Sequence, residues 1–316
     1  MAKYYILPKR LIDRVPWIET PVWAFEAGVF YLWLGLVRLM PFPVARGLFA
    51  RLMGFAGYRN RNKRRVVLRN LEVVLPEATE AQRADVAREV FRTTGRAAVE
   101  LFLLGRLWKR RARYLAFDVH PEAQAAIDRK EPIVYATAHA GAWQLTPLLG
   151  RKFGISISVL YAPDGNPMLN RFFLGRRAAF GGPLVPTFGG GREMIRELAA
   201  GRSVGAAFDT RIDQGELVPF FGVPAPTNTL PAMLGLRGYK VVPTRAVRLS
   251  GCRYRIEVMA PLAPADAEAP RQAQVLDLTR QINGVFESWI REDPGQWICM
   301  KRRWPKDHAT ARAADV

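Results

Sequence analysis

The sequence predicts an α/β protein whose sheet is flanked by helices and preceded by a membrane-associated helical segment. After residue 131, short apolar and β-branched runs alternate with stretches of helical character, a pattern typical of an α/β sheet. Before them, residues 22–40 form a strongly apolar and aromatic segment. With 316 residues, 49% of them hydrophobic, the chain is long enough to bury a sizeable core.

The strands are expected where short apolar or β-branched runs occur. In such folds, ligand chemistry is found at the carboxyl ends of the strands. The expected strands are Ile133–Ala138, Ile155–Tyr161, Leu184–Phe188, Ser203–Phe208, Val241–Leu249 and Tyr254–Met259.

Helices are expected before and between these strands. Thr79, with Gln82 three residues later, forms a capping-box pattern that predicts a helix running to about Trp108. Further helices are expected at Trp143–Phe153, Pro167–Phe180, Arg192–Ala200, Asn228–Tyr239 and Leu276–Glu292.

The charge balance indicates an anionic partner or surface. Lys and Arg number 47 and Asp and Glu 28, which gives a net charge of +19. Nucleic acid, acidic lipid and a phosphorylated substrate would all fit, but the sequence carries no recognised nucleic-acid signature, which makes nucleic acid the weakest of the three. The two cysteines cannot form a disulfide framework, and the three histidines lie too far apart for a local metal motif, so no metal site is expected.

The N-terminal apolar segment resembles an interfacial helix more than a spanning one. Its uncharged run, residues 27–37, is shorter than the roughly 20 residues needed to cross a bilayer. Aromatic residues of the kind found at lipid headgroups lie in or just before it, and an Arg-rich stretch follows. The alternative is an ordinary buried helix. The chain is therefore expected to contain a membrane-associated helix (residues 1–45), a single α/β domain (46–305) and a loose tail (306–316).

His139 is the candidate catalytic residue. It directly follows the expected strand Ile133–Ala138, at the edge where α/β sheets place active sites, and Gly141 lets the backbone turn there. A lone histidine is also often structural. Its position alone does not decide between the two roles.

The segment around His139 resembles a known family. This is the bacterial lysophospholipid acyltransferase-like group, which includes the late acyltransferases of lipid A biosynthesis and the acyltransferases of mycobacterial phosphatidylinositol mannosides. In its H-x-G-N-W-E hallmark, His139, Gly141 and Trp143 match, whereas Ala142 replaces Asn and Gln144 replaces the carboxylate. Other elements follow in the family's order: the segment 65–83 with Glu100, Asn166–Pro167 with Arg177, Asp209 with the segment 219–227, and the segment 294–304.

The resemblance implies a layered α/β acyltransferase fold with a central mixed sheet. It also implies transfer of a fatty acyl group from acyl carrier protein or coenzyme A to a hydroxyl of a membrane glycolipid or phospholipid, with a lipid A precursor as the first expectation. No bound cofactor is expected, and the expected location is the cytoplasmic face of the bacterial inner membrane. An alcohol needs a base to take its proton at neutral pH, and His139 is the residue expected to do so.

The missing carboxylate leaves two readings of the catalytic pair. Gln144 can orient the imidazole through its amide oxygen but cannot stabilise imidazolium with a charge. Asp209 ends the expected strand Ser203–Phe208 and should lie on the same sheet edge as His139. In mycobacterial relatives, an acidic residue in this region is thought to join the catalytic His. Asp is also a common residue for capping a turn.

Substrate contacts are expected from clustered arginines at family positions and from two pairs of phenylalanines. Arginine forms bidentate contacts with phosphates, of the kind carried by lipids and by phosphopantetheine donors. The phenylalanine pairs would line an acyl groove or belong to the core. The candidate phosphate contacts are Arg171, Arg176, Arg177, Arg302 and Arg303, and the aromatic candidates are Phe172, Phe173, Phe220 and Phe221.

A second class of function remains open from the sequence. Because Gln144 breaks the hallmark, the chain could be a catalytically degenerate, basic membrane-binding relative. An acyltransferase acting on a different glycolipid or aminolipid is a further alternative.

Overall fold

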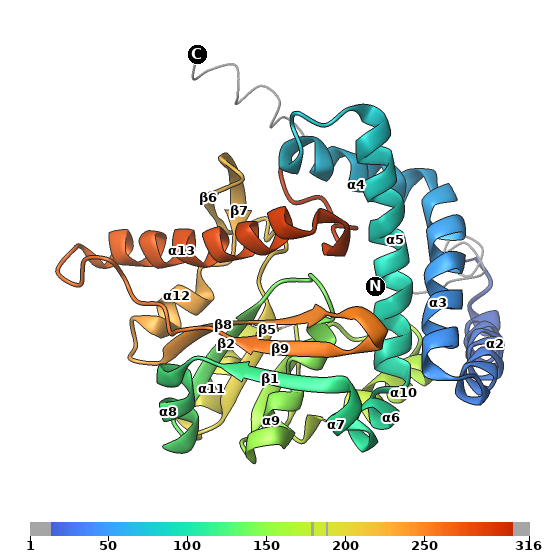
Figure 1. The fold of residues 1–316 in the computed structure, drawn as a ribbon, viewed down its shortest axis with the longest axis horizontal. Helices are drawn as coiled ribbons and strands as arrows, with labels where there is room; N and C mark the ends of the chain where they lie inside the picture. Colours follow the sequence, from blue (N-terminus) through green and yellow to red (C-terminus); the bar gives the residue numbers. More distant parts are fainter. Residues whose placement is uncertain (1–13, 178–179, 188, 306–316) are drawn as a thin grey trace.

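In the computed structural model of the protein, which describes residues 14–177, 180–187 and 189–305, helices precede a central sheet (Figure 1). The expected tail, residues 306–316, and the first part of the N-terminal segment lie outside the described residues. A single 3₁₀ turn, Pro16–Ile18, and a π-helical turn, Met53–Gly57, accompany the early helices. These helices are α2 (Glu19–Leu39), α3 (Phe42–Leu52), α4 (Arg61–Val74), α5 (Glu80–Phe102), α6 (Leu104–Lys109) and α7 (Arg111–Tyr114).

The central sheet is mixed, as expected. Its seven strands have the order β1-β9-β8-β2-β5-β3-β4, and β8 and β9 form its one antiparallel pair. All the expected strands are present, and β1 is an additional edge strand that the sequence pattern did not predict. The strands are β1 (Leu115–Val119), β2 (Ile133–Thr137), β3 (Ile157–Tyr161), β4 (Leu184–Pro186), β5 (Ser203–Ala207), β8 (Lys240–Arg248) and β9 (Tyr254–Val258).

A separate two-stranded hairpin was also missed. β6 (Glu216–Phe220) and β7 (Val223–Thr227) pair antiparallel across a turn in which Phe221 and Gly222 have φ of 53° and 72°. Positive φ at both central residues is typical of the tight turns that match strand twist. The prolines of this segment argue against a strand in a sheet interior, but an isolated ribbon has edges on which Pro loses no ladder bond.

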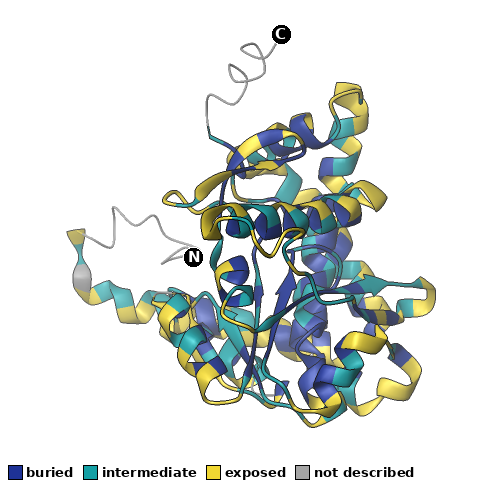
Figure 2. Cartoon of the chain, turned by 90° about the vertical axis from the view of Figure 1, so that its left-hand side faces the viewer, coloured by how far each residue is buried: buried dark blue, intermediate teal, exposed yellow. Residues whose placement is uncertain are grey.

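Helices cover both faces of the sheet, and buried residues lie between the layers (Figure 2). α8, α9 and α10 pack on one face, and α11, α12 and α13 pack on the other. α5 stands across the carboxyl ends of the central strands and contributes to both hydrophobic clusters (Figure 1). The bounds are α8 (Pro121–Asp128), α9 (Leu148–Phe153), α10 (Pro167–Arg177), α11 (Gly190–Ala199), α12 (Leu230–Gly235) and α13 (Arg271–Glu292).

The helix expected over Trp143–Phe153 is broken. A 3₁₀ turn covers Trp143–Leu145, and α9 starts only at Leu148. Pro147 lies between them, and a proline inside a continuous helix would remove a backbone hydrogen bond and clash with the preceding turn. The capping box at Thr79 is confirmed: its hydroxyl accepts from the Gln82 N–H at 3.2 Å, and the Gln82 side chain accepts from the Thr79 N–H at 2.8 Å.

α2 is docked on the α/β domain while one of its faces stays exposed. The Asn166 amide donates to the Trp23 carbonyl at 3.1 Å and to Glu26 Oε2 at 3.2 Å, tying the start of α10 to α2. Leu34 and Val37 of α2 are buried in the cluster shared with the sheet. Among the described residues, α2 is the one helix long and apolar enough to cross a membrane. Its exposed apolar side chains are Phe25, Val29, Tyr31, Leu32, Trp33, Leu36 and Leu39.

Candidate active site

The loop that carries His139 is fixed by its glycine. His139 lies two residues beyond β2, and Gly141 in this loop has φ of 58°. A Cβ atom at residue 141 would lie 2.4 Å from the Ala246 carbonyl oxygen, which also accepts the Ala142 N–H at 2.8 Å. Any other residue would strain the backbone and collide with β8, so the loop path requires Gly141.

His139 and Asp209 form a hydrogen-bonded pair. His139 Nδ1 lies 2.7 Å from Asp209 Oδ1. β2 and β5, which carry them, are parallel neighbours, so both residues leave the sheet at the same edge. The Asp209 side chain is 2% exposed and that of His139 is 32% exposed. The carboxylate is therefore enclosed, whereas the ring remains accessible.

Asp209 is held as a carboxylate. Burial would raise its pKa, but the electrostatic interaction with His139 and the hydrogen bonds from His139 and Trp297 outweigh burial, so its pKa lies below the ordinary value. Trp297 Nε1 donates to Asp209 Oδ2 at 2.8 Å. Because an ionised carboxylate only accepts hydrogen bonds, we assign the proton on His139 to Nδ1. Nε2 then carries the lone pair required of a base.

The segment after α13 is hydrogen-bonded to the His139 loop and holds it in place. The Ile298 N–H donates to the His139 carbonyl at 2.8 Å, and the Gly141 N–H donates to the Gln296 carbonyl at 3.1 Å. Together with the indole contact to Asp209, these bonds join residues 296–298 to both members of the pair. From the sequence, this segment is recognisable only as a family motif, and its positioning role is not predicted. Its Trp was the available signal, because a buried indole usually finds an acceptor for its N–H.

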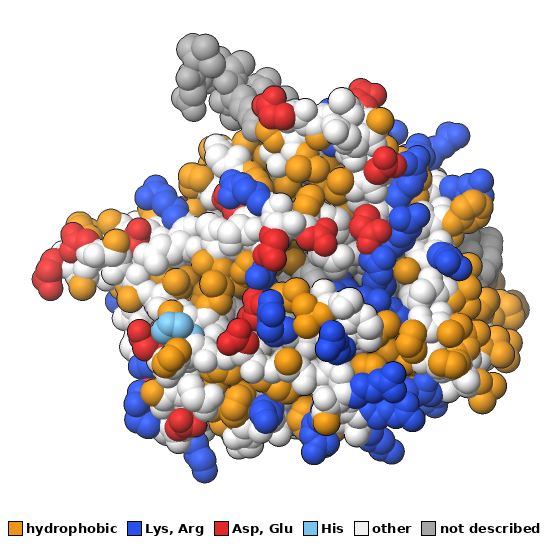
Figure 3. Space-filling view, viewed as in Figure 1, with side chains coloured by type: hydrophobic (Ala, Val, Ile, Leu, Met, Phe, Trp, Pro, Cys, Tyr) orange, Lys and Arg blue, Asp and Glu red, His pale blue; other side chains and the backbone are white. Residues whose placement is uncertain are grey.

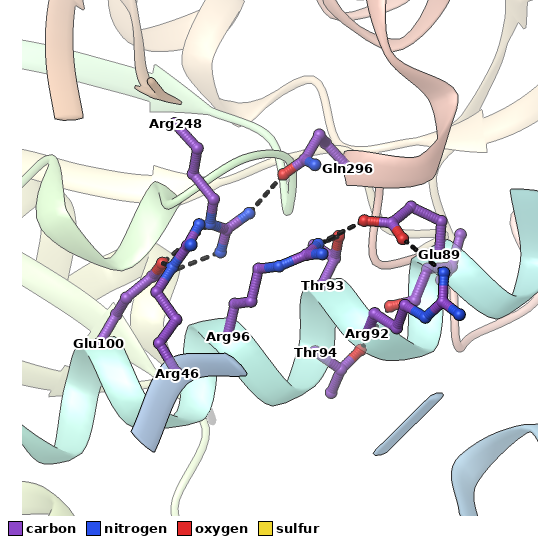
Figure 4. Close-up of polar contacts among 10 residues, drawn as sticks. Arg46, Glu89, Arg92, Thr93, Thr94, Arg96, Glu100, Arg248 and Gln296 are labelled. Atoms are coloured by element: carbon purple, nitrogen blue, oxygen red, sulfur yellow. Dashed lines mark hydrogen bonds and ion pairs between the residues drawn. The ribbon is translucent and has the colours of Figure 1, made fainter. Parts of the chain in front are cut away.

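A buried ion-pair network supports the same segment (Figure 4). The Glu100 carboxylate on α5 accepts from Arg248 at 2.8 and 2.7 Å and from Arg46 at 3.2 Å. The Arg248 guanidinium also donates to Gln296 Oε1 at 2.5 Å. Burial would raise the pKa of Glu100, but the two arginines and the Tyr254 hydroxyl lower it below the ordinary value. The network joins α3, α5 and β8 to the residue that holds Gly141.

Gln144 lies near His139 without pairing with it. It belongs to the 3₁₀ turn Trp143–Leu145 and lines the cavity that His139 faces. Within the described part of the chain, no hydrogen bond joins its amide to the His139 ring, whose Nδ1 is taken by Asp209. The geometry thus brings Asp209, and not Gln144, into contact with the imidazole.

A cavity of about 470 Å³ extends from His139 into the protein. One of its walls is a face of the sheet, where Tyr135, Gly205 and Val159 stand in register on β2, β5 and β3. α5 and α10 form other parts of the wall, with residues such as Leu101 and Phe173. Most of this lining is apolar, so the cavity suits a hydrocarbon chain.

The expected arginine contacts are not in one place. Arg177 lines the cavity, stacks 5.6 Å from the Tyr161 ring centroid, and has its pKa lowered by burial. Arg171 is exposed, and Arg176 and Arg302 are half-buried. Arg303 is 1% exposed and donates to the Pro226 carbonyl and the Thr227 hydroxyl, both at 2.7 Å. Its guanidinium therefore binds the β6–β7 hairpin inside the protein.

The phenylalanine candidates also divide. Phe173 lines the cavity, and Phe172 is buried beside it. Phe220 packs against the rings of Trp297 and Trp304, at 6.1 and 5.7 Å between centroids, and Phe221 packs against Phe220 at 5.1 Å. The pair on the hairpin therefore belongs to the core beneath Asp209. Among the described residues, no cluster of three or more His, Cys, Asp or Glu could hold a metal ion.

Comparison with known proteins gives consistent matches. Residues 18–306 match the family described as bacterial lipid A biosynthesis acyltransferase. The chain is 23% identical over 306 residues to the lipid A biosynthesis acyltransferase of Haemophilus influenzae, covering 92% of this chain and 91% of that protein. It is 26% identical over 178 residues to the lipid A biosynthesis myristoyltransferase of Escherichia coli and to lipid A biosynthesis acyltransferase 1 of Shigella flexneri, covering 54% of each.

Proposed function

The chain belongs to the family of bacterial lipid A biosynthesis acyltransferases, and on that basis we propose that it transfers a fatty acyl group to a hydroxyl of a lipid A precursor with His139 as the general base. The observation that carries this proposal is the 2.7 Å contact between His139 Nδ1 and Asp209 Oδ1. It supplies the charge that Gln144 lacks. Without it, the chain would have a base with no anionic partner.

In the proposed reaction, His139 Nε2 takes the proton of the acceptor hydroxyl as its oxygen attacks the thioester carbonyl. A C–O bond forms, and the tetrahedral intermediate collapses with cleavage of the C–S bond. The leaving thiolate then receives the proton from His139. Asp209 stabilises the imidazolium that exists between the two proton transfers and keeps the ring in one tautomer.

We assign the acyl chain of the donor to the cavity beside His139. Its apolar lining would stabilise the hydrocarbon, and its opening at His139 would leave the thioester carbonyl near the base. The donor is an acyl thioester of acyl carrier protein or coenzyme A, and the reaction requires no bound cofactor. Arg177 at the cavity, with Arg171, Arg176 and Arg302, supplies cations for phosphates of donor or acceptor.

The acceptor is a membrane lipid, so we place the protein on the cytoplasmic face of the inner membrane, attached through α2. The exposed aromatic and aliphatic side chains of α2 support this attachment. The opposite side of α2 is docked on the catalytic domain through Leu34 and through the hydrogen bond from Asn166. The attachment therefore holds the catalytic domain close to the lipid surface.

A direct assay tests the proposed function. Purified protein is incubated with a lipid A precursor and either acyl-carrier-protein or acyl-coenzyme A donors, and acylated product is measured by mass spectrometry. Wild type should form product, and His139→Ala should be at least about a hundredfold slower with an unchanged circular dichroism spectrum. Wild type inactive with every donor would favour the degenerate membrane-binding relative. Lipids from a deletion strain would identify a different glycolipid acceptor.

A further inference from the structure

A dense group of cations lies on α6, α7 and α9, away from the catalytic pair. We call it the basic cluster. No Asp or Glu occurs in the sequence between residues 101 and 117. A groove of about 600 Å³ in this region is bordered by Lys109, Arg110, Arg111, Arg113 and Lys152. The basic cluster consists of Arg106, Lys109, Arg110, Arg111, Arg113, Arg151 and Lys152.

Three exposed cations of this cluster have no carboxylate partner among the residues that the structure describes. Lys109, Arg110 and Arg113 are exposed, and none of them has an ion pair in the described ranges of the chain. Some other surface arginines do pair with carboxylates, as Arg88 does with Asp85 and Arg291 with Glu287. A concentrated positive field of this kind is typical of a surface that binds anions.

The basic cluster is joined to the end of the apolar helix α2. Arg106 donates to the carbonyls of Arg38 and Met40 at 2.5 and 2.8 Å, so α6 holds the C-terminal end of α2. Leu36 and Leu39 at that end are 44% and 84% exposed. Figure 3 shows Lys and Arg side chains gathered over α6 and α7, beside the hydrophobic side chains over α2 and α3.

Trp108 lies within the cluster, with two arginines close to its ring. The guanidinium carbons of Arg111 and Arg151 lie 5.1 and 4.7 Å from its ring centroid. Tryptophan is enriched at the headgroup level of membranes, and cations next to apolar surface bind anionic lipids. The segment therefore combines both components of an interfacial site.

We propose that the basic cluster binds the phosphates of anionic lipid headgroups while the exposed face of α2 contacts the adjoining hydrocarbon. Continuity with an apolar surface favours a membrane over an acidic protein, because a soluble acidic partner would not require exposed Leu36 and Leu39 beside its cations. The proposal extends the membrane location given above and does not depend on the acyl-transfer chemistry. Cations at such a position would also fix which end of α2 lies among the headgroups.

Vesicle sedimentation of the purified full-length chain tests this. The vesicles are phosphatidylcholine alone or a mixture of phosphatidylcholine and phosphatidylglycerol. We expect wild type to prefer the anionic vesicles and the preference to weaken in high salt. The variant with Lys109, Arg110, Arg111 and Arg113 all changed to Gln should lose at least about tenfold of its affinity for anionic vesicles, because each cation near such a surface adds to binding.

A matched control separates this surface from the overall charge. The control variant changes four exposed cations over the opposite side of the sheet to Gln and has the same net charge as the cluster variant. A third variant, with Arg110, Arg111 and Arg113 changed to Lys, keeps the charge and should bind as wild type does, which excludes a purely structural effect. The control positions are Arg192, Arg237, Arg271 and Arg280.

Three results would overturn the proposal. The first is unchanged binding of anionic vesicles by the cluster variant. The second is an equal loss in the control variant, which would mean that binding follows net charge alone. The third is a cluster variant that binds vesicles normally but has a higher KM for acyl-carrier-protein donors and an unchanged KM for coenzyme A donors. That result would assign the surface to an acidic carrier protein. The first two results come from vesicle binding without turnover, so an inactive enzyme would not affect them.

Discussion

Asp209 reaches His139 from a neighbouring strand, with 2.7 Å between Oδ1 and Nδ1, and thereby provides the carboxylate that the position of Gln144 does not. The two residues are 70 positions apart in the chain. Their meeting depends on the parallel pairing of β2 and β5, in which Thr137 is opposite Ala207. Asp209 is further fixed by the Trp297 indole, so the anion is positioned before substrate arrives.

Changing Asp209→Asn should reduce turnover by about a hundredfold or more. A neutral amide cannot stabilise imidazolium and can hold the ring in the wrong tautomer. The measurement is kcat for Asp209→Asn beside Trp297→Phe, which removes the hydrogen bond to Oδ2 and part of the buried ring but keeps the carboxylate, and which should do less harm. A folded Asp209→Asn protein with near-normal kcat would contradict the assigned role.

Changing Gln144→Glu should raise kcat less than about threefold, because Nδ1 of His139 is already bonded to Asp209 and proton transfer gains little from a second anion out of contact. The same change in an Asp209→Asn background tests whether residue 144 can act as the partner. A large gain in the wild-type background would show that Gln144 is a weakened remnant of the ordinary pair.

Changing Gly205→Leu should shorten the acyl chain that the enzyme accepts. A Cβ atom at residue 205 would lie in ordinary contact with Ile157 and Tyr135, at 3.5 and 3.9 Å, so Ala should fit, whereas Leu would extend into the cavity. We expect kcat/KM to fall at least about tenfold for long donors and less for short ones, as the apolar contacts of the chain end are lost. An equal fall in kcat/KM for all donors would mean that the acyl chain does not bind beside residue 205.

Changing Glu100→Gln should destabilise the fold by about 3–5 kcal/mol, because Arg248 loses its buried carboxylate. The folded-state pKa of Glu100 is lowered, so its contribution is complete above the unfolded value of about 4.3 and is lost as the pH falls toward the folded value. Urea unfolding from pH 7 to pH 3 should therefore show the difference between wild type and variant shrinking in acid. A stability difference between wild type and Glu100→Gln that does not change with pH would mean that the ionised Glu100 carboxylate is not what stabilises the fold.

Changing Arg177→Lys and Arg303→Lys should have different consequences. Arg303 donates through two nitrogens to the hairpin, so Lys there should lower the free energy of unfolding. Arg177 lies at the cavity, so Lys there should raise KM, because the planar fork is lost while the charge is kept. Unfolding curves and steady-state kinetics on both variants check this. Equal kinetics for Arg177→Lys would leave only a nonspecific electrostatic role.

The sequence by itself determined the α/β class, the expected strands and the location of His139 at a strand end. These follow from local patterns, because a β-branched run or a capping box has its effect within a few residues. The hairpin β6–β7 and the break before α9 were not predicted. In both places the effect of a proline depends on the structure around it. Pro147 ended a helix that the apolar pattern would have continued, and the prolines near Phe220 lie on a ribbon with free edges.

Only the tertiary structure decided which side chain pairs with His139. Gln144 is close in sequence, but Asp209 is close in space, because strand order brings β2 beside β5. The same reason separates the arginines: Arg302 and Arg303 are adjacent in the chain, yet Arg303 points into the core. Contacts of this kind depend on strand order and on which elements pack together. Residue spacing along the chain predicts neither of them.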